Sequence, residues 1–94
     1  MTSTIVRTSK ELVWQTRKDL GLAQAGFGAM LGVTRQMVQQ LEAGTTYFDI
    51  DRISAGLTST DPTLRRFWLD YHAIRYRETM ATIVARVDAI GGVE

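Results

Sequence analysis

A row of hydrogen-bonding side chains near the middle of this 94-residue chain could do recognisable chemistry. It consists of Arg35, Gln36, Gln39 and Gln40, which share one side of a helix and are called the polar row below. An arginine can pair with the edge of a guanine through two hydrogen bonds, and a glutamine can do the same with an adenine. The alternative is an ordinary solvated polar surface, and Gln40 lies further round the helix than the other three. The row predicts a base-reading helix if other elements hold this side outward.

Two short helices joined by a tight turn are predicted to position the row, over residues 24–31 and 35–43. Glycine ends each helix, because it adopts a left-handed backbone conformation without steric cost. A threonine begins the second helix, since its side chain can accept a hydrogen bond from a free backbone N–H. These residues are Gly32, Gly44 and Thr34. This is the layout of a helix-turn-helix, whose second helix enters the major groove of DNA.

Three further helices complete an all-α fold. They are predicted over residues 9–20, over residues 50–57 and from Pro62 onward for about thirty residues. Thr8 and Glu11 form a capping box before the first of them, in which each side chain satisfies the other's backbone N–H. Apolar residues at helical spacing predict the core, with Phe27, Leu31, Val38, Leu41, Ile50, Ile53 and Leu57.

The chain is predicted to contain two units, residues 1–60 and residues 61–94. The first is a compact four-helix domain preceded by a short arm or strand at residues 2–7. The second is one long helix of roughly 43 Å, which exceeds the expected body width of about 26 Å. The far end of this helix therefore cannot lie on its own domain.

Two apolar sets share the long helix. Four residues near its start are expected to dock on the body, namely Leu64, Phe67, Trp68 and Tyr71. A second set steps by four and three residues, as in the seam of a coiled coil, and predicts a homodimer. The alternative is a helix packed within its own chain and broken near Glu78 and Thr79. The seam consists of Leu69, Ala73, Tyr76, Met80, Ile83, Val87 and Ile90.

Composition argues against several other classes of protein. The chain has no cysteine, so disulfides and thiolate metal sites are excluded. His72 is the only histidine, and there is no glycine-rich phosphate loop or nucleophile elbow, so no enzyme activity, metal or cofactor is expected. No signal peptide or membrane span is expected, which favours the cytoplasm. With a formal net charge of +1, a DNA-binding surface must arise from the placement of charge.

Residues 9–57 resemble the lambda-repressor and Cro-like (XRE-type) helix-turn-helix regulators of bacteria and phages. The resemblance rests on RKDLGLAQ before the first helix of the pair, on GVTRQ at the turn and on LEAG at the end of the second helix. It implies double-stranded DNA as the partner and base contacts by the polar row. It also implies that Arg17 and Glu42 form a structural ion pair between helices.

The resemblance implies phosphate contacts around the row. Gln24 would hold a phosphate together with the N–H groups at its helix start, the alternative being a simple polar cap. Thr45, Thr46 and Tyr47 would offer hydroxyl and backbone N–H groups, the alternative being a plain loop. The complete implied contact set is Gln24, Thr34, Arg35, Gln36, Gln39, Gln40, Thr45, Thr46 and Tyr47.

Four residues depart from the family pattern. Gly26 and Gly28 each weaken a helix by up to about 1 kcal/mol relative to alanine. Gly28 has an expected reason, since a small residue there lets the two short helices approach each other. Asp49 and Asp51 stand where basic residues are common in the family, so DNA binding of modest affinity is expected.

These expectations combine into a dimeric repressor that reads a palindromic operator. Its half-sites would lie about 34 Å apart, which is one helical turn of DNA. The alternative is an antitoxin or adaptor of a two-gene module, which would bind a toxin or another partner protein through the long helix.

Overall fold

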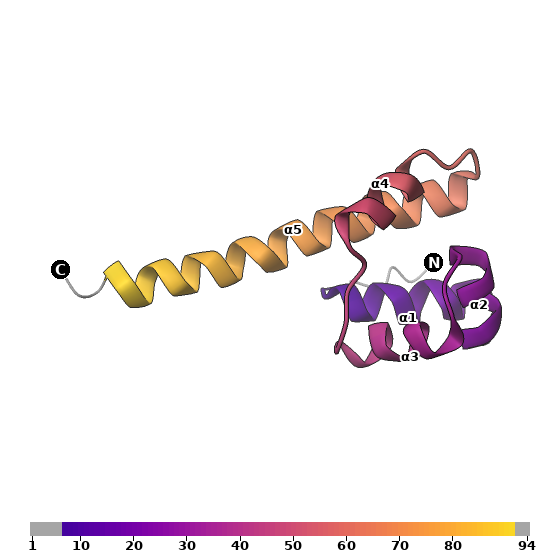
Figure 1. The fold of residues 1–94 in the computed structure, drawn as a ribbon, viewed down its shortest axis with the longest axis horizontal. Helices are drawn as coiled ribbons and strands as arrows, with labels where there is room; N and C mark the ends of the chain where they lie inside the picture. Colours follow the sequence, from indigo (N-terminus) through magenta and orange to yellow (C-terminus); the bar gives the residue numbers. More distant parts are fainter. Residues whose placement is uncertain (1–6, 92–94) are drawn as a thin grey trace, which may run out of the picture.

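The computed structural model describes residues 7–91, and this part of the chain folds into five α-helices (Figure 1). The predicted all-α class is confirmed, and the described residues contain no strand. The predicted arm or strand at residues 2–7 lies outside them apart from its last residue. The helices are α1 (Ser9–Asp19), α2 (Gln24–Leu31), α3 (Arg35–Ala43), α4 (Ile50–Leu57) and α5 (Pro62–Gly91).

The helix ends follow local signals in the sequence. Thr34 and Asp49 are the N-cap residues of α3 and α4, and each accepts a hydrogen bond from a backbone N–H three residues on, at 3.1 and 2.8 Å. Gly32 and Gly44 follow α2 and α3 in the left-handed conformation, with φ of 77° and 79°. These ends fix the length of α3 and therefore which of its residues point outward.

The capping box at the start of α1 forms with one change. Thr8 accepts a hydrogen bond from the backbone N–H of Glu11 at 3.2 Å, as predicted. The Glu11 carboxylate accepts from the Thr8 hydroxyl at 3.0 Å, where the sequence predicts a backbone donor. The N–H of Ser9, the first residue of α1, donates to Glu78 of α5 at 2.9 Å. The start of α1 is therefore capped by a distant helix as well as by its neighbour in sequence.

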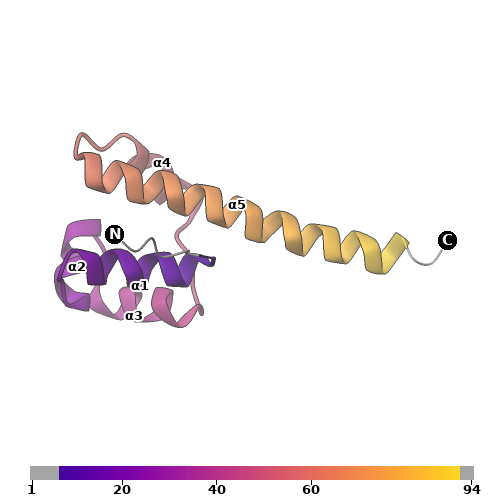
Figure 2. The same ribbon diagram turned by 180° about the vertical axis from the view of Figure 1, so that it is seen from behind.

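The helices are layered, with α1 in the middle. α1 packs against both α3 and α5, while α2 packs against α3 and α4 packs against α5. In both views α3 and α5 lie on opposite sides of α1 (Figures 1 and 2). This arrangement leaves one side of α3 uncovered.

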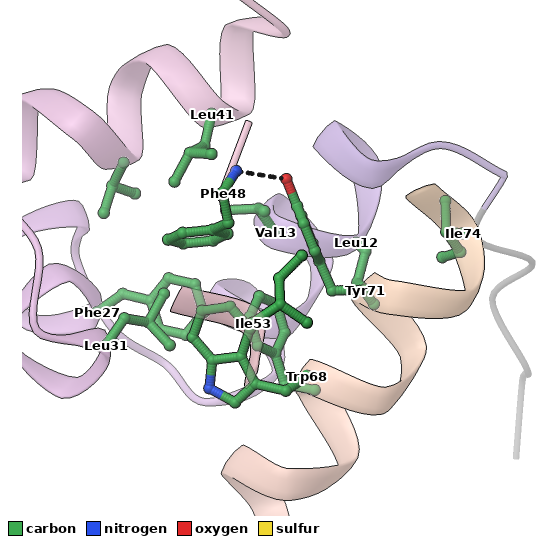
Figure 3. Close-up of a cluster of buried hydrophobic side chains, with 12 residues drawn as sticks. Leu12, Val13, Phe27, Leu31, Leu41, Phe48, Ile53, Trp68, Tyr71 and Ile74 are labelled. Atoms are coloured by element: carbon green, nitrogen blue, oxygen red, sulfur yellow. Dashed lines mark hydrogen bonds between the residues drawn. The ribbon is translucent and has the colours of Figure 1, made fainter. Parts of the chain in front are cut away.

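An aromatic cluster joins the start of α5 to the rest of the body (Figure 3). Phe67, Trp68 and Tyr71, which the sequence predicts to dock, are buried. Phe48, from the loop after α3, packs edge-on against Trp68 and Tyr71, with ring centroids 4.7 and 5.1 Å apart. The core thus continues across the predicted boundary after residue 60, and the first turns of α5 belong to it.

One predicted core residue is wrong. Ile50 is 75% exposed at the first position of α4, and the buried side of this helix begins with Ile53. Phe48 is buried instead, and its backbone N–H donates to the Tyr71 hydroxyl at 3.0 Å (Figure 3). The buried apolar residues are Leu12, Val13, Phe27, Leu31, Val38, Leu41, Phe48, Ile53, Phe67, Trp68, Tyr71 and Ile74.

Two glycines allow close approach between elements. A Cβ at Gly28 would lie 2.8 Å from the backbone oxygen of Val33, in the turn between α2 and α3, so a small residue is needed there. A Cβ at Gly56 would overlap the ring of Trp68, so α4 can lie this close to α5 only with a glycine. By contrast, a Cβ at Gly26 would meet only a neighbouring side chain, at 3.6 Å.

α5 is one unbroken helix that extends beyond the body of the domain. It continues through Glu78 and Thr79, so the break that the alternative prediction places there is not found. Every residue from 79 to 90 is exposed, and the described part of the chain measures 51 Å along its longest axis. The far half of α5 therefore has no packing partner within the described chain (Figure 2).

Candidate nucleic-acid interface

α3 has one buried side and one outward side. Val38 and Leu41 are buried in the core, and Met37 is partly buried against it. The polar row lies exposed on the other side, with Arg35, Gln36, Gln39 and Gln40. Within residues 7–91 no side-chain hydrogen bond or ion pair occupies these four side chains. Their donors and acceptors are therefore available to an external ligand.

A partly buried ion pair between α1 and α3 fixes the direction of the row. Arg17 and Glu42, the pair that the resemblance implies, make two hydrogen bonds, from Nε to Oε2 at 2.6 Å and from Nη2 to Oε1 at 3.0 Å. Their side chains are 12% and 9% exposed. The hydrogen bond to Glu42 raises the pKa of Arg17, although burial opposes the rise. Arg17 also donates to the Leu22 carbonyl at 3.1 Å, which ties in the segment before α2.

Gln24 lies at the start of α2, but its side chain is partly engaged. Its Nε2 donates to Oε1 of Glu42 at 3.2 Å, which leaves one of the two amide hydrogens free. α2 has no side-chain cap, because its N-cap residue is Ala23. The backbone N–H groups of its first turn are therefore open to an acceptor such as a phosphate oxygen.

The segment after α3 is more engaged than the sequence predicts. The Thr45 hydroxyl donates to the Gln40 carbonyl at 3.2 Å, so it helps to cap α3. Thr46 is partly buried. Tyr47 is 46% exposed, and the guanidinium carbon of Arg75 lies 3.7 Å from its ring centroid. Nothing in the spacing of the sequence reveals this contact, because Arg75 belongs to α5.

The predicted seam of α5 is exposed along its whole length. At about 100° per residue, it lies on nearly the opposite side of the helix from Phe67, Tyr71 and Ile74, which face the body. Its large members are between 39% and 73% exposed, and Val84 beside them is 52% exposed. The members of the seam are Leu69, Ala73, Tyr76, Met80, Ile83, Val87 and Ile90.

The described part of the chain offers no metal-binding cluster. It contains no group of three or more His, Cys, Asp and Glu side chains that could hold an ion. His72 is exposed on α5. No helix in the described range is long and apolar enough to cross a membrane.

Comparison with known proteins finds one matching family. Residues 15–55 match the family model described as helix-turn-helix. The match begins within α1, includes α2, the turn and all of α3, and ends within α4. It therefore contains the Arg17–Glu42 pair and the polar row, and it leaves out α5. No curated protein and no solved structure matches the chain.

Proposed function

Residues 15–55 are a helix-turn-helix domain of the lambda-repressor-like kind, and we propose that the chain is a sequence-specific repressor that binds a palindromic operator as a homodimer. The domain by itself supports DNA binding and transcriptional regulation in general. The observation that carries the finer proposal is the outward side of α3. Four Arg and Gln side chains stand there without partners in the described chain, on a helix held by a partly buried ion pair.

The polar row suits base reading in the major groove. Arg35 and Gln36 lie in the first turn of α3, which is the part of such a helix that reaches deepest into the groove. Arg35 would pair with a guanine, and Gln36 or Gln39 would pair with an adenine. Each bidentate pair contributes about 1–3 kcal/mol of discrimination against the wrong base.

Neutral groups would supply most of the phosphate contacts. The uncapped start of α2 offers backbone N–H groups beside the free amide hydrogen of Gln24. The Thr34 hydroxyl is exposed at the start of α3 and can still donate a hydrogen bond. Asp49, which stands where family members are often basic, caps α4 instead. Few cations thus face the DNA, which fits the modest affinity expected from the sequence.

Homodimerisation through the seam of α5 would pair two such domains. Covering the large seam residues stabilises a dimer by at most about 1.5–3 kcal/mol each. A two-fold symmetric dimer reads a palindrome, and half-sites about 34 Å apart place both α3 helices on one side of the DNA. Repression then needs only occupancy of the operator, because a bound dimer blocks other proteins from the same sequence.

The experiment compares base discrimination in matched variants. Binding sites are enriched from random duplexes, and affinities for the enriched and a scrambled duplex are measured by gel shift. Arg35→Ala and Gln36→Ala should each reduce the ratio of the two affinities by about five- to 150-fold. Arg77→Ala is the control, because Arg77 is exposed on α5 and its loss removes the same charge as the loss of Arg35. An unchanged ratio in Arg35→Ala would refute the base-reading assignment.

The exposed seam also favours a second candidate, an antitoxin or adaptor of a two-gene module. In that case the seam would bind a different protein, such as a toxin encoded by the neighbouring gene. A stable complex of the two purified proteins, lost when the seam is substituted, would support this candidate. A seam occupied by a second copy of the chain would exclude the toxin from the same surface.

A further inference from the structure

We propose that Arg75 and Glu78 of α5 are positioning residues for DNA binding, because they clamp the segment after α3 and the start of α1 to the long helix. These two residues are called the α5 clamp below. The inference rests on the proposed DNA binding by α3 and its flanking segments. Neither residue is proposed to touch DNA itself.

Glu78 holds the start of α1. Its Oε2 accepts the backbone N–H of Ser9 at 2.9 Å, and its Oε1 accepts the Ser9 hydroxyl at 2.9 Å. Ser9 is 2% exposed, so these hydrogen bonds satisfy groups that water cannot reach. A carboxylate at a helix N-terminus is also favoured by the helix dipole. Burial would raise the pKa of Glu78, but hydrogen bonds from Ser9 and Arg75 outweigh burial and lower it below its usual value.

Arg75 connects Glu78 to the segment after α3. Its Nη1 donates to Oε1 of Glu78 at 3.0 Å, and its guanidinium lies over the ring of Tyr47, with Cζ 3.7 Å from the centroid. A cation over an aromatic face is attracted by the ring quadrupole, more strongly where water is partly excluded. The side chains of Arg75 and Glu78 are 26% and 25% exposed, so this site is partly shielded.

The residue after Tyr47 is held by the same helix. The backbone N–H of Phe48 donates to the Tyr71 hydroxyl at 3.0 Å, one turn of α5 before Arg75. Two consecutive residues of the α3–α4 segment are thus fixed to α5, one by a buried hydrogen bond and one by the clamp. The segment begins directly after Gly44, so its position is linked to the C-terminal end of α3.

The α5 clamp lies where α5 leaves the body. Beyond Glu78 every described residue up to 90 is exposed, and this stretch carries the outer members of the seam. Together with the buried contacts of Tyr71 and Ile74, the clamp therefore helps to fix the direction of the seam relative to α3. In a dimer this direction determines how far apart the two α3 helices stand, and DNA demands about 34 Å between half-sites. Loosening the clamp should weaken binding to a palindrome without changing any group that contacts DNA.

The test uses Arg75→Ala with Arg77→Ala as its matched control. Both variants remove one arginine from α5, but Arg77 is exposed and forms no ion pair within the described residues. Amide hydrogen exchange of the full chain without DNA is measured by NMR. Exchange at Ser9, whose amide donates to Glu78, should become about tenfold faster in Arg75→Ala than in Arg77→Ala, because Arg75 holds the Glu78 carboxylate in place. An unchanged Phe48 amide, protected by Tyr71, would show that the core is intact.

Operator affinity is measured on the same proteins. Arg75→Ala should bind the palindrome about three- to tenfold more weakly than Arg77→Ala, and it should tolerate altered half-site spacing better. Arg75→Lys should be intermediate, because lysine keeps the charge but cannot donate to Glu78 while stacking flat on Tyr47.

The outcomes separate the two proposals. A wild-type chain that binds no duplex at all would refute the proposed function, while the exchange data would still show whether the clamp exists. A wild type that binds DNA, together with equal affinities of Arg75→Ala and Arg77→Ala, would overturn the positioning role alone. Equal exchange rates in the two variants would overturn the clamp itself.

Discussion

Glu42 shows how one partly buried carboxylate connects three helices. It accepts two hydrogen bonds from Arg17 of α1 and one from Gln24 of α2, while it belongs to α3. Removing one partner of a buried ion pair costs about 3–5 kcal/mol, which is an upper bound for this partly buried site and still exceeds the worth of a surface ion pair. The direction of the polar row thus depends on a group that does not itself face outward.

Acid should weaken the hold of Glu78 on α1. Its pKa is lowered in the folded protein, so its ionised form stabilises the fold above about pH 4.5 and this contribution is lost as pH falls through the lowered value. We expect wild type to melt at a higher temperature than Glu78→Gln at pH 7. The gap should begin to shrink as the pH falls below about 4.5, and it should close once the pH lies below the lowered pKa of Glu78, where both side chains are neutral.

The measurement is the melting temperature of both proteins by circular dichroism from pH 7 to pH 3. Comparing the two proteins at each pH cancels the titration of all other groups. A gap that stays constant down to pH 3 would contradict the assigned role of the ionised carboxylate.

Sequence reasoning at the residue scale succeeds where a contact follows from a local or family pattern. The Arg17–Glu42 pair follows from the resemblance. The stack of Arg75 on Tyr47 could not be predicted. Tyr47 lies in the loop before α4 and Arg75 lies on α5, and no spacing rule links residues so far apart in the sequence. The burial of Phe48 in place of Ile50 was missed for a similar reason, since it depends on the path of the chain into α4.

At the scale of elements, the turn between α2 and α3 depends on close backbone approach. A Cβ at Gly28 would meet the Val33 oxygen at 2.8 Å and atoms of Thr34 at 3.2 Å, all of them backbone atoms that cannot swing aside. Gly26 in the same helix has an ordinary van der Waals neighbour at 3.6 Å. The two glycines therefore form a natural pair for comparison.

Substituting each glycine by alanine should have opposite effects on stability. Gly28→Ala should lower the free energy of unfolding by about 1–3 kcal/mol, because the turn must shift. Gly26→Ala should raise it by up to about 1 kcal/mol, because alanine favours helix and no contact opposes it. Urea unfolding followed by circular dichroism measures both, and destabilisation by Gly26→Ala would show that this helix carries a constraint of another kind.

Helix positions were predictable because their ends are marked by residues that act locally. Thr34 and Gly44 define α3 by hydrogen bonding and by a left-handed backbone, without reference to the rest of the fold. The packing of α4 on α5 was not predictable, since it depends on Gly56 facing the ring of Trp68. No local pattern in the sequence predicts the contact between Gly56 and Trp68.

At the scale of the whole molecule, α5 lies in two environments: its first turns are buried in the core and its outer half is exposed. Its first turns contribute Phe67, Trp68 and Tyr71 to the core, so a chain cut at the predicted boundary after residue 60 would lose part of its core. The division into units of residues 1–60 and 61–94 stays a prediction, and a test of dimerisation must keep α5 at least to Glu78. Point variants in the outer half of the seam meet this requirement.

Charges placed in the seam should prevent dimerisation. The double variant Ile83→Asp and Val87→Asp would put two carboxylates per chain into the proposed interface. We expect the dimer dissociation constant to rise by about thirtyfold or more, because each buried unpaired charge costs several kcal/mol. Sedimentation equilibrium measures the change directly.

The matched control places the same charges on the other side of the helix. Ala81→Asp and Ala85→Asp lie nearly opposite the seam and are also exposed. This variant should dimerise like wild type. Equal weakening in both variants would indicate that charge, not the seam, governs association, and a monomeric wild type would favour a different protein as the partner of α5.

The outer half of α5, which has no tertiary contacts within the described chain, makes the folding of this stretch depend on the concentration of the protein. About a dozen residues without tertiary contacts form only a marginal helix in water, so in a lone chain this stretch would fray, and pairing would restore its order. For the proposed dimer, operator occupancy would then rise with the square of the copy number at low expression. A cell could thus set a threshold for this regulator without any signalling ligand, simply by how many molecules it makes.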